Sequence, residues 1–169
     1  EEGVREVVRT VLLPWWNSLS FFTTYAEADE ITEADLAAAP PVAERPEIDR
    51  WIISLLNSLI RDVKEQYENY EPTRAARLIQ DFVIENLSNW YVRLNRKRYW
   101  GGDFDKDKQA AYQTLYNCLE SVSMLAAPVA PFYMDKLFND LNGVSGRHQV
   151  DSVHLTRFPE CDCKLIDSA

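Results

Sequence analysis

The sequence predicts an all-α fold, an antiparallel bundle of about five helices with a short extended C-terminal segment. Apolar residues recur at helical spacing through most of the 169 residues. Connections of only a few residues, at Glu71 and at Gly101–Gly102, favour antiparallel packing of the helices that they join. With 46% hydrophobic residues, a chain of this length can bury a core without crosslinks, so we expect one domain over residues 1–169.

The five expected helices are separated by proline, glycine and aspartate signals. Pro14 interrupts the first helix because proline has no amide hydrogen for the helical ladder. Gly101–Gly102 ends the third helix, and Asp103 or Asp105 caps the fourth. The expected helices cover approximately residues 4–25, 46–70, 72–100, 104–127 and 131–141.

The tail, residues 150–169, follows turn signals at Asn142–Gly143 and Ser145–Gly146. Within it Val153, Leu155 and Phe158 alternate with polar residues, a pattern that is typical of a short extended segment.

Most of the net charge of −9 lies in one stretch, residues 26–49, which holds eight acids and one base, a net of −7. Residues 26–46 also contain Ala37–Pro41, a composition that favours a solvated surface loop, with an acidic interaction segment as the alternative. The other residues have a net charge near neutral, at −2, so overall acidity does not exclude a basic patch.

Membrane, disulfide and metal chemistry have little support. No apolar run approaches the ~18 residues of a membrane span. Cys118, Cys161 and Cys163 are odd in number, and with His154 the last two lack the ligand count and spacing of structural zinc. His148 and His154 have no neighbouring nucleophile in the sequence and are expected at the surface.

The strongest candidate site is the end of the third helix, residues 89–100, where four cations fall within six residues. A helical wheel places Trp90, Tyr91 and Leu94 toward the bundle, and the polar residues on the opposite side. The candidate RNA-binding residues are Asn89, Arg93, Arg96, Lys97, Arg98 and Trp100, with Arg98 between the two faces.

Two interpretations fit this cationic helix end. Arginines one turn apart, about 5.4 Å, suit successive phosphates, and a neighbouring Trp100 suits stacking on an unpaired base. Alternatively, the cations only complement the C-terminal end of the helix dipole and face solvent.

Several segments, taken in order and spacing, resemble the isoleucyl-tRNA synthetases, which are class I aminoacyl-tRNA synthetases. Asp49–Ile52 and Ala126–Phe132 are similar to motifs shared with the valine, leucine and methionine enzymes, and Asn89–Arg93 is similar to the isoleucine enzymes. The other similar segments are Leu13–Asn17, Tyr70–Ala76, Ala111–Tyr116 and Ser152–Leu155. The resemblance covers almost the whole chain except the acidic loop.

The resemblance implies the helical anticodon-binding domain that follows the catalytic core. It implies an isoleucine anticodon stem-loop and the catalytic domain of the same polypeptide as partners, with Arg93, Arg96, Lys97 and Arg98 at phosphates. Asn89 and Trp100 would then contact bases. The family's two ATP-site signatures are absent from these residues, so no cofactor is expected here, and ATP and Mg²⁺ would bind elsewhere in the parent enzyme. We expect a cytoplasmic monomer without catalysis of its own.

Other interpretations stay open at the level of sequence. A helical scaffold for protein interaction would bind a partner helix in an apolar groove and would be insensitive to charge reversal at Arg93 and Arg96. The same domain of a valine, leucine or methionine enzyme shares the more general motifs. A free-standing helical enzyme would need a pocket with clustered ionisable groups, and no sequence pattern points to one.

Overall fold

The computed structural model describes residues 2–167, and within them every regular element is a helix. Residues 1, 168 and 169 of the expected domain and tail lie outside this range. The all-α prediction is confirmed. The α-helices are α1 (Glu2–Val7), α2 (Leu13–Ala28), α3 (Glu33–Ala37), α4 (Glu47–Glu68), α5 (Pro72–Asp81), α6 (Arg93–Tyr99), α7 (Lys106–Ala126) and α8 (Pro131–Ser145).

Two π-helical segments join α-helices end to end. Val8–Leu12 connects α1 to α2, and Phe82–Val92 connects α5 to α6. The first segment lies directly before Pro14, which takes one of the first positions of α2. The interruption expected at Pro14 is therefore a change of hydrogen-bond pattern just before the proline, whose ring nitrogen cannot donate to the preceding turn.

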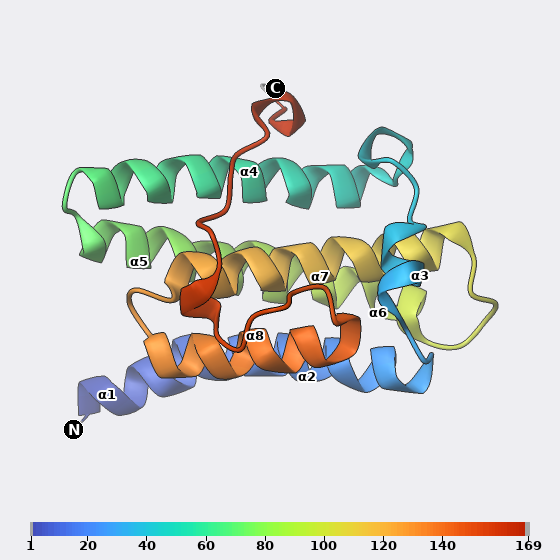
Figure 1. The fold of residues 1–169 in the computed structure, drawn as a ribbon, viewed down its shortest axis with the longest axis horizontal. Coiled ribbons are helices and arrows are strands. Elements are labelled where there is room, and N and C mark those ends of the chain that lie inside the picture. Colours follow the sequence, from blue (N-terminus) through green and yellow to red (C-terminus); the bar gives the residue numbers. More distant parts are fainter. Residues whose placement is uncertain (1, 168–169) are drawn as a thin grey trace.

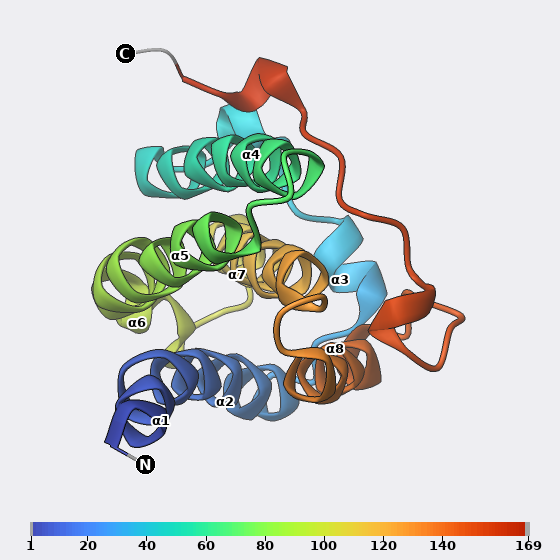
Figure 2. The same ribbon diagram turned by 90° about the vertical axis from the view of Figure 1, so that its left-hand side faces the viewer.

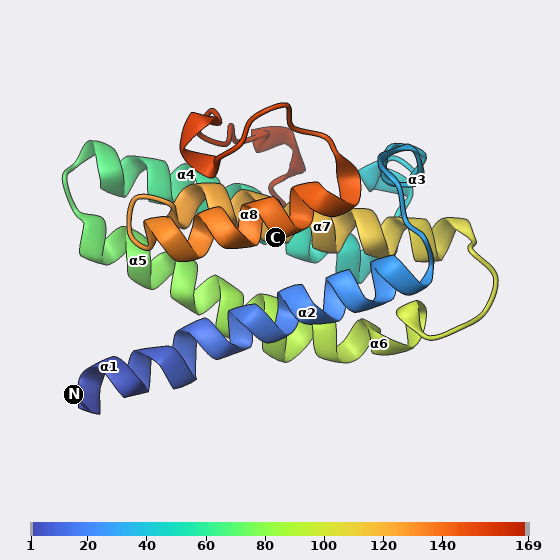
Figure 3. The same ribbon diagram turned by 60° about the horizontal axis from the view of Figure 1, so that its bottom comes forward.

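Helices joined by a short connection pack antiparallel, whereas α4 runs parallel to α7; together α2, α4, α5 and α8 surround α7 (Figures 1 and 2). The turn at Glu71 folds α5 back along α4, and the turn before Pro131 folds α8 back along α7. Figure 3 shows α2 running beside the helix that ends in α6. The connections expected at Glu71 and at Gly101–Gly102 are confirmed, and the two glycines adopt φ of 62° and 78°.

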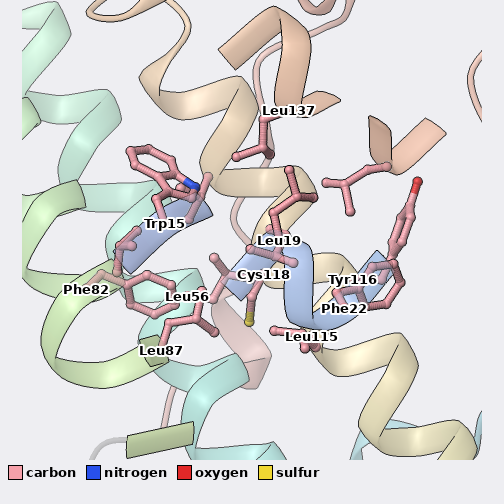
Figure 4. Packing of buried hydrophobic residues seen from close by; sticks show 14 of the residues in the cluster. Trp15, Leu19, Phe22, Leu56, Phe82, Leu87, Leu115, Tyr116, Cys118 and Leu137 are labelled. Carbon is pink, nitrogen blue, oxygen red and sulfur yellow. The ribbon is translucent and has the colours of Figure 1, made fainter. Parts of the chain in front are cut away.

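The core lies on all sides of α7. Leu115, Tyr116 and Cys118 of α7 are fully buried and pack among side chains from α2, α4, α8 and the helix between α5 and α6 (Figure 4). Asp105 caps α7 by accepting a hydrogen bond from the Lys108 amide. The apolar face that the sequence predicts for this helix is confirmed as core.

The stretch expected to be a solvated acidic loop, residues 26–46, is largely exposed but contains the end of α2, the helix α3 and a 3₁₀ turn at Val42–Glu44. The side chains of Thr32 and Asp35 form a reciprocal capping box that begins α3. Leu36 of α3 is 1% exposed, and Ile31 is also buried. The prediction of a loop without packed elements was wrong around α3, because composition alone does not reveal the capping box and the two buried apolar side chains.

The C-terminal segment crosses α8, α7 and α4 largely without regular structure (Figure 1). The alternation expected from Val153 to Phe158 does not form a strand among the described residues. Val153 begins a short 3₁₀ turn and is buried, whereas Leu155 in the same turn is exposed. Further along, the Asp162 amide donates to Asn57 of α4, which fixes the segment on the bundle.

Candidate nucleic-acid interface

The cationic residues occupy the end of one continuous helix, which runs through α5, Phe82–Val92 and α6. Ile79, Leu87 and Tyr91 fix one side of this helix in the core, each at most 2% exposed. The helix ends where Trp100 turns to an extended backbone before the two glycines. Its last turn therefore projects from a rigid element, with the negative end of the helix dipole beside the cations.

Most of the predicted site residues lie on the surface of this helix end. Asn89, Arg93, Arg96 and Lys97 are exposed, and the Trp100 side chain is 53% exposed. Within residues 2–167, none of these five side chains makes a hydrogen bond or ion pair. Among the described residues, three cations without acidic partners, one asparagine amide and one indole are therefore exposed along the end of this helix.

Arg98 is placed differently, in a buried ion-pair network. Its guanidinium donates to both carboxylate oxygens of Asp49 at 2.7 and 2.8 Å, and to both oxygens of Asp107 at 2.9 and 2.8 Å. It also donates to the side-chain carbonyl of Asn95 at 3.0 Å. Its side chain is 15% exposed, and that of Asp49 is fully buried.

The charge of Arg98 is already balanced inside the protein by Asp49 and Asp107. Burial lowers the pKa of Arg98, but the hydrogen bonds that its guanidinium donates to Asp49 and Asp107 outweigh this effect, so the pKa is raised overall. The buried Tyr91 hydroxyl also donates to Asp49 at 2.7 Å, and burial raises the pKa of Tyr91. Arg98 joins α6 to α4 and α7, so a phosphate would have to compete with acceptors already in place.

Trp90 and Leu94 correct the helical-wheel prediction. Both were expected to point into the bundle, but they are 59% and 57% exposed, while Tyr91 is fully buried as expected. The wheel assumed an α-helical period, whereas Phe82–Val92 forms π-helical i→i+5 bonds that rotate later residues around the axis. Two large apolar side chains therefore flank the cations, a feature that an α-helical period could not reveal.

The histidines and cysteines form no metal site among residues 2–167. In the part of the chain that the structure describes, no three His, Cys, Asp or Glu side chains are grouped to hold a metal. His154 is exposed, but His148 is half-buried and lies 2.6 Å from Glu120 through its Nε2, unlike the surface position expected for it. The Cys161 and Cys163 sulfurs lie 3.2 Å apart as free thiols.

Among the residues placed by the structure, no helix is both long and apolar enough to pass through a bilayer.

A helical bundle that displays unpaired cations and indoles at one helix end has the character of a nucleic-acid-binding domain. Residues 49–169 match the family described as the anticodon-binding domain of tRNA ligases, and the chain belongs to this family. Its match starts at Asp49, the buried partner of Arg98, and includes the whole cationic helix.

The chain is similar to curated isoleucine–tRNA ligases from several bacteria. The chain is 58% identical over 168 residues to that of Bacteroides fragilis, 55% identical over 166 residues to that of Cytophaga hutchinsonii, and 46% identical over 166 residues to that of Thermus thermophilus. Each alignment covers 98% of this chain but only 14%, 15% and 16% of the relative, respectively. The resemblance to isoleucyl-tRNA synthetases is confirmed, and the chain spans about one seventh of their length.

Proposed function

We propose that this chain binds the anticodon stem-loop of an isoleucine tRNA as one domain of an isoleucine–tRNA ligase. Its role is to hold the anticodon end so that the acceptor end reaches a catalytic domain elsewhere in the polypeptide. ATP and Mg²⁺ serve that catalytic domain, and this domain supplies binding and orientation. We further propose that it acts in the cytoplasm within a monomeric enzyme.

The observation that carries this proposal is the group of unpaired cations at the end of α6. Arg93, Arg96 and Lys97 lie within about one helical turn, so their charged groups reach neighbouring phosphates of one RNA strand. Phosphate contacts of this kind position an RNA, and splayed loop bases are then read by stacking and by hydrogen bonds to their edges. Asn89 and Trp100 supply the amide and the indole for base contacts beside these cations.

Arg98 contributes indirectly in this proposal. Because its guanidinium bonds Asp49 and Asp107, it fixes the last turn of the helix on the bundle. A fixed turn presents the neighbouring cations with little conformational entropy left to lose on binding.

The test is binding of this chain to an isoleucine anticodon stem-loop over a salt series, measured by fluorescence anisotropy of labelled RNA. The variant is Arg93→Glu/Arg96→Glu, and each lost phosphate contact flattens the slope of log K against log salt by about 0.7 to 0.9. We therefore expect the slope to fall by up to about 1.8, together with a large loss of affinity at low salt.

The same helix offers a matched control. Arg74 and Arg77 have the same three-residue spacing and are also exposed, but they lie at the opposite end, in α5. Arg74→Glu/Arg77→Glu changes the net charge by the same amount, so it separates a local contact from a general electrostatic effect. Equal losses in the two double variants, or no binding by the unchanged chain at low salt, would refute the proposed interface.

A further inference from the structure

A groove of about 300 Å³ lies between α2 and the cationic helix, next to the proposed interface. Ser20, Phe21 and Tyr25 of α2 line one wall, and Ser88, Val92 and Arg96 line the other. The two helices run side by side along this groove (Figure 3). Its volume is at the low end of small-molecule sites, ~300 to 1,000 Å³, and suits one planar group rather than a larger ligand.

The aromatic wall of the groove, formed by Phe21 and Tyr25, packs against the core. The rings of Phe21 and Tyr25 lie 4.8 Å apart between centroids, and Phe21 also packs edge-on against Tyr99 at 5.0 Å. Tyr99 is 1% exposed and donates its hydroxyl to the Ala111 carbonyl, so this support is part of the core. Phe21 and Tyr25 are themselves half-buried, which leaves part of each ring for a ligand.

Four polar side chains of the groove have no hydrogen-bond partner among the described residues. Within residues 2–167, no hydrogen bond is made by the side chains of Asn17, Ser20, Thr24 and Ser88. Hydroxyl and amide groups donate and accept, so together they can pair with the edge of any nucleobase. Arg96, at the same groove, supplies a positive charge without an acidic partner.

Charge distinguishes this groove from the one on the other side of α2. The second groove, between α2 and α8, has a volume of about 610 Å³ and includes Glu27, Glu30 and Asp140 in its lining. The groove beside Arg96 has no acid in its lining. A phosphate-bearing ligand is therefore repelled from the larger groove and attracted to the smaller one.

We infer that the groove between α2 and the cationic helix receives one unpaired nucleotide of the bound RNA loop. Its base stacks on the Phe21–Tyr25 wall, its edge pairs with the hydroxyls of Ser20, Thr24 or Ser88, and Arg96 contacts its phosphate. This inference rests on the proposed function, because it assigns a base to a site beside the phosphate contacts. Stacking of an unpaired base on an aromatic side chain is tolerant of sequence, and the hydroxyls add the edge contacts.

The experiment places a tryptophan side chain in the proposed base site and, as a control, in the acidic groove between α2 and α8. Thr24 lines the proposed base site, whereas its neighbour Thr23 lines the acidic groove. Thr24→Trp and Thr23→Trp have identical composition, but about 100° around α2 separates the two positions, so each enters a different groove. Each variant is first shown to be folded by circular dichroism and thermal unfolding, and then its affinity for the isoleucine anticodon stem-loop is measured.

We expect Thr24→Trp to weaken binding by roughly 5- to 150-fold, the range of one lost base-stacking contact, and Thr23→Trp to bind like the unchanged chain. A second set of stem-loops carries an abasic nucleotide at each loop position in turn. One abasic position should weaken binding to the unchanged chain by a similar factor and have no further effect with Thr24→Trp.

The possible failures are distinguishable. If the unchanged chain binds the stem-loop but both tryptophan variants bind equally well, the base site is wrong and the phosphate interface stands. If abasic positions weaken binding to Thr24→Trp as much as to the unchanged chain, the base site is again wrong. Absence of stem-loop binding by the unchanged chain at low salt would overturn both the interface and the groove.

Discussion

Replacement of Arg98 by methionine tests whether this residue belongs to the fold or to the RNA interface. The change leaves the Asp49 carboxylate at zero exposure with the Tyr91 hydroxyl as its remaining side-chain donor. Removal of one partner from a buried ion pair costs about 3 to 5 kcal/mol, because the remaining charge is uncompensated. For a domain of this size that corresponds to a fall of roughly 6 to 20 °C in Tm.

The second variant, Arg98→Met/Asp49→Asn, also removes the negative charge of the buried Asp49 carboxylate. The asparagine carbonyl still accepts the hydrogen bond from Tyr91, so we expect the double variant to be more stable than Arg98→Met alone. Urea unfolding followed by circular dichroism measures both free energies of unfolding. A loss below about 1 kcal/mol for Arg98→Met, or a double variant less stable than the single one, would show that the network does not hold the helix end.

The same double variant separates the two roles of Arg98 in RNA binding. Because its donors bond Asp49, Asp107 and Asn95, we expect the salt slope for the anticodon stem-loop to stay unchanged in the refolded double variant. A direct phosphate contact, as the sequence predicted for Arg98, would instead flatten that slope by about 0.7 to 0.9. The measurement therefore refutes one of the two assignments.

Three further predictions follow from burial and hydrogen bonding. Leu36→Ala should destabilise the chain by about 2 to 5 kcal/mol in urea unfolding, whereas a leucine in a solvated loop would change little. Burial, together with the hydrogen bond to the neighbouring thiol, raises the pKa of Cys161 to about 11, so its alkylation, followed by mass spectrometry, should accelerate up to that pH. The buried Cys118, whose pKa burial also raises, should stay unlabelled until the chain unfolds. Hydrogen bonds from Ser152 and the following amide lower the pKa of Asp135 below 3.8, so the stability that they add is full above that pH and lost as pH falls through the lowered pKa. Hydrogen-exchange protection of the amide that follows Ser152 should therefore fall as Asp135 becomes protonated.

Periodicity predicted the long helices well because each has a wide apolar face and clear end signals. Pro72 and Gly101 bound the cationic helix as the sequence indicated. Leu36 was missed because a helix of five residues is too short to show a period, so its burial depends on a cap and one side chain. Trp90 and Leu94 were misplaced because the wheel assumed a period of 3.6 residues, whereas the buried residues Ile79, Val83, Leu87 and Tyr91 recur every four residues along the π-helical segment.

The sequence predicted the exposed cations of the candidate site, but not the contacts that depend on residues far away in the chain. Arg93, Arg96 and Lys97 are exposed as expected, since their neighbours in sequence define the buried side. The pairing of Arg98 depends on Asp49, which lies 49 residues earlier in the chain and on a different helix. The groove beside Arg96 is likewise formed by α2, so neither the ion pair nor the groove could be read from the cationic segment alone.

The distribution of charge explains how an acidic chain can present a surface for RNA. The stretch of residues 26–49 holds eight acids and one base, and part of it forms α3, which lies across α7 from α6 (Figure 2). Three acids of that stretch contribute little to the external field, because Asp49, Asp29 and Glu33 pair with Arg98, Lys108 and Arg147. The remaining acids repel phosphates from the α3 side while Arg93, Arg96 and Lys97 attract them to the α6 side. In the proposed interface, the uneven distribution of charge therefore directs an approaching RNA toward the cationic helix end, although the net charge is −9.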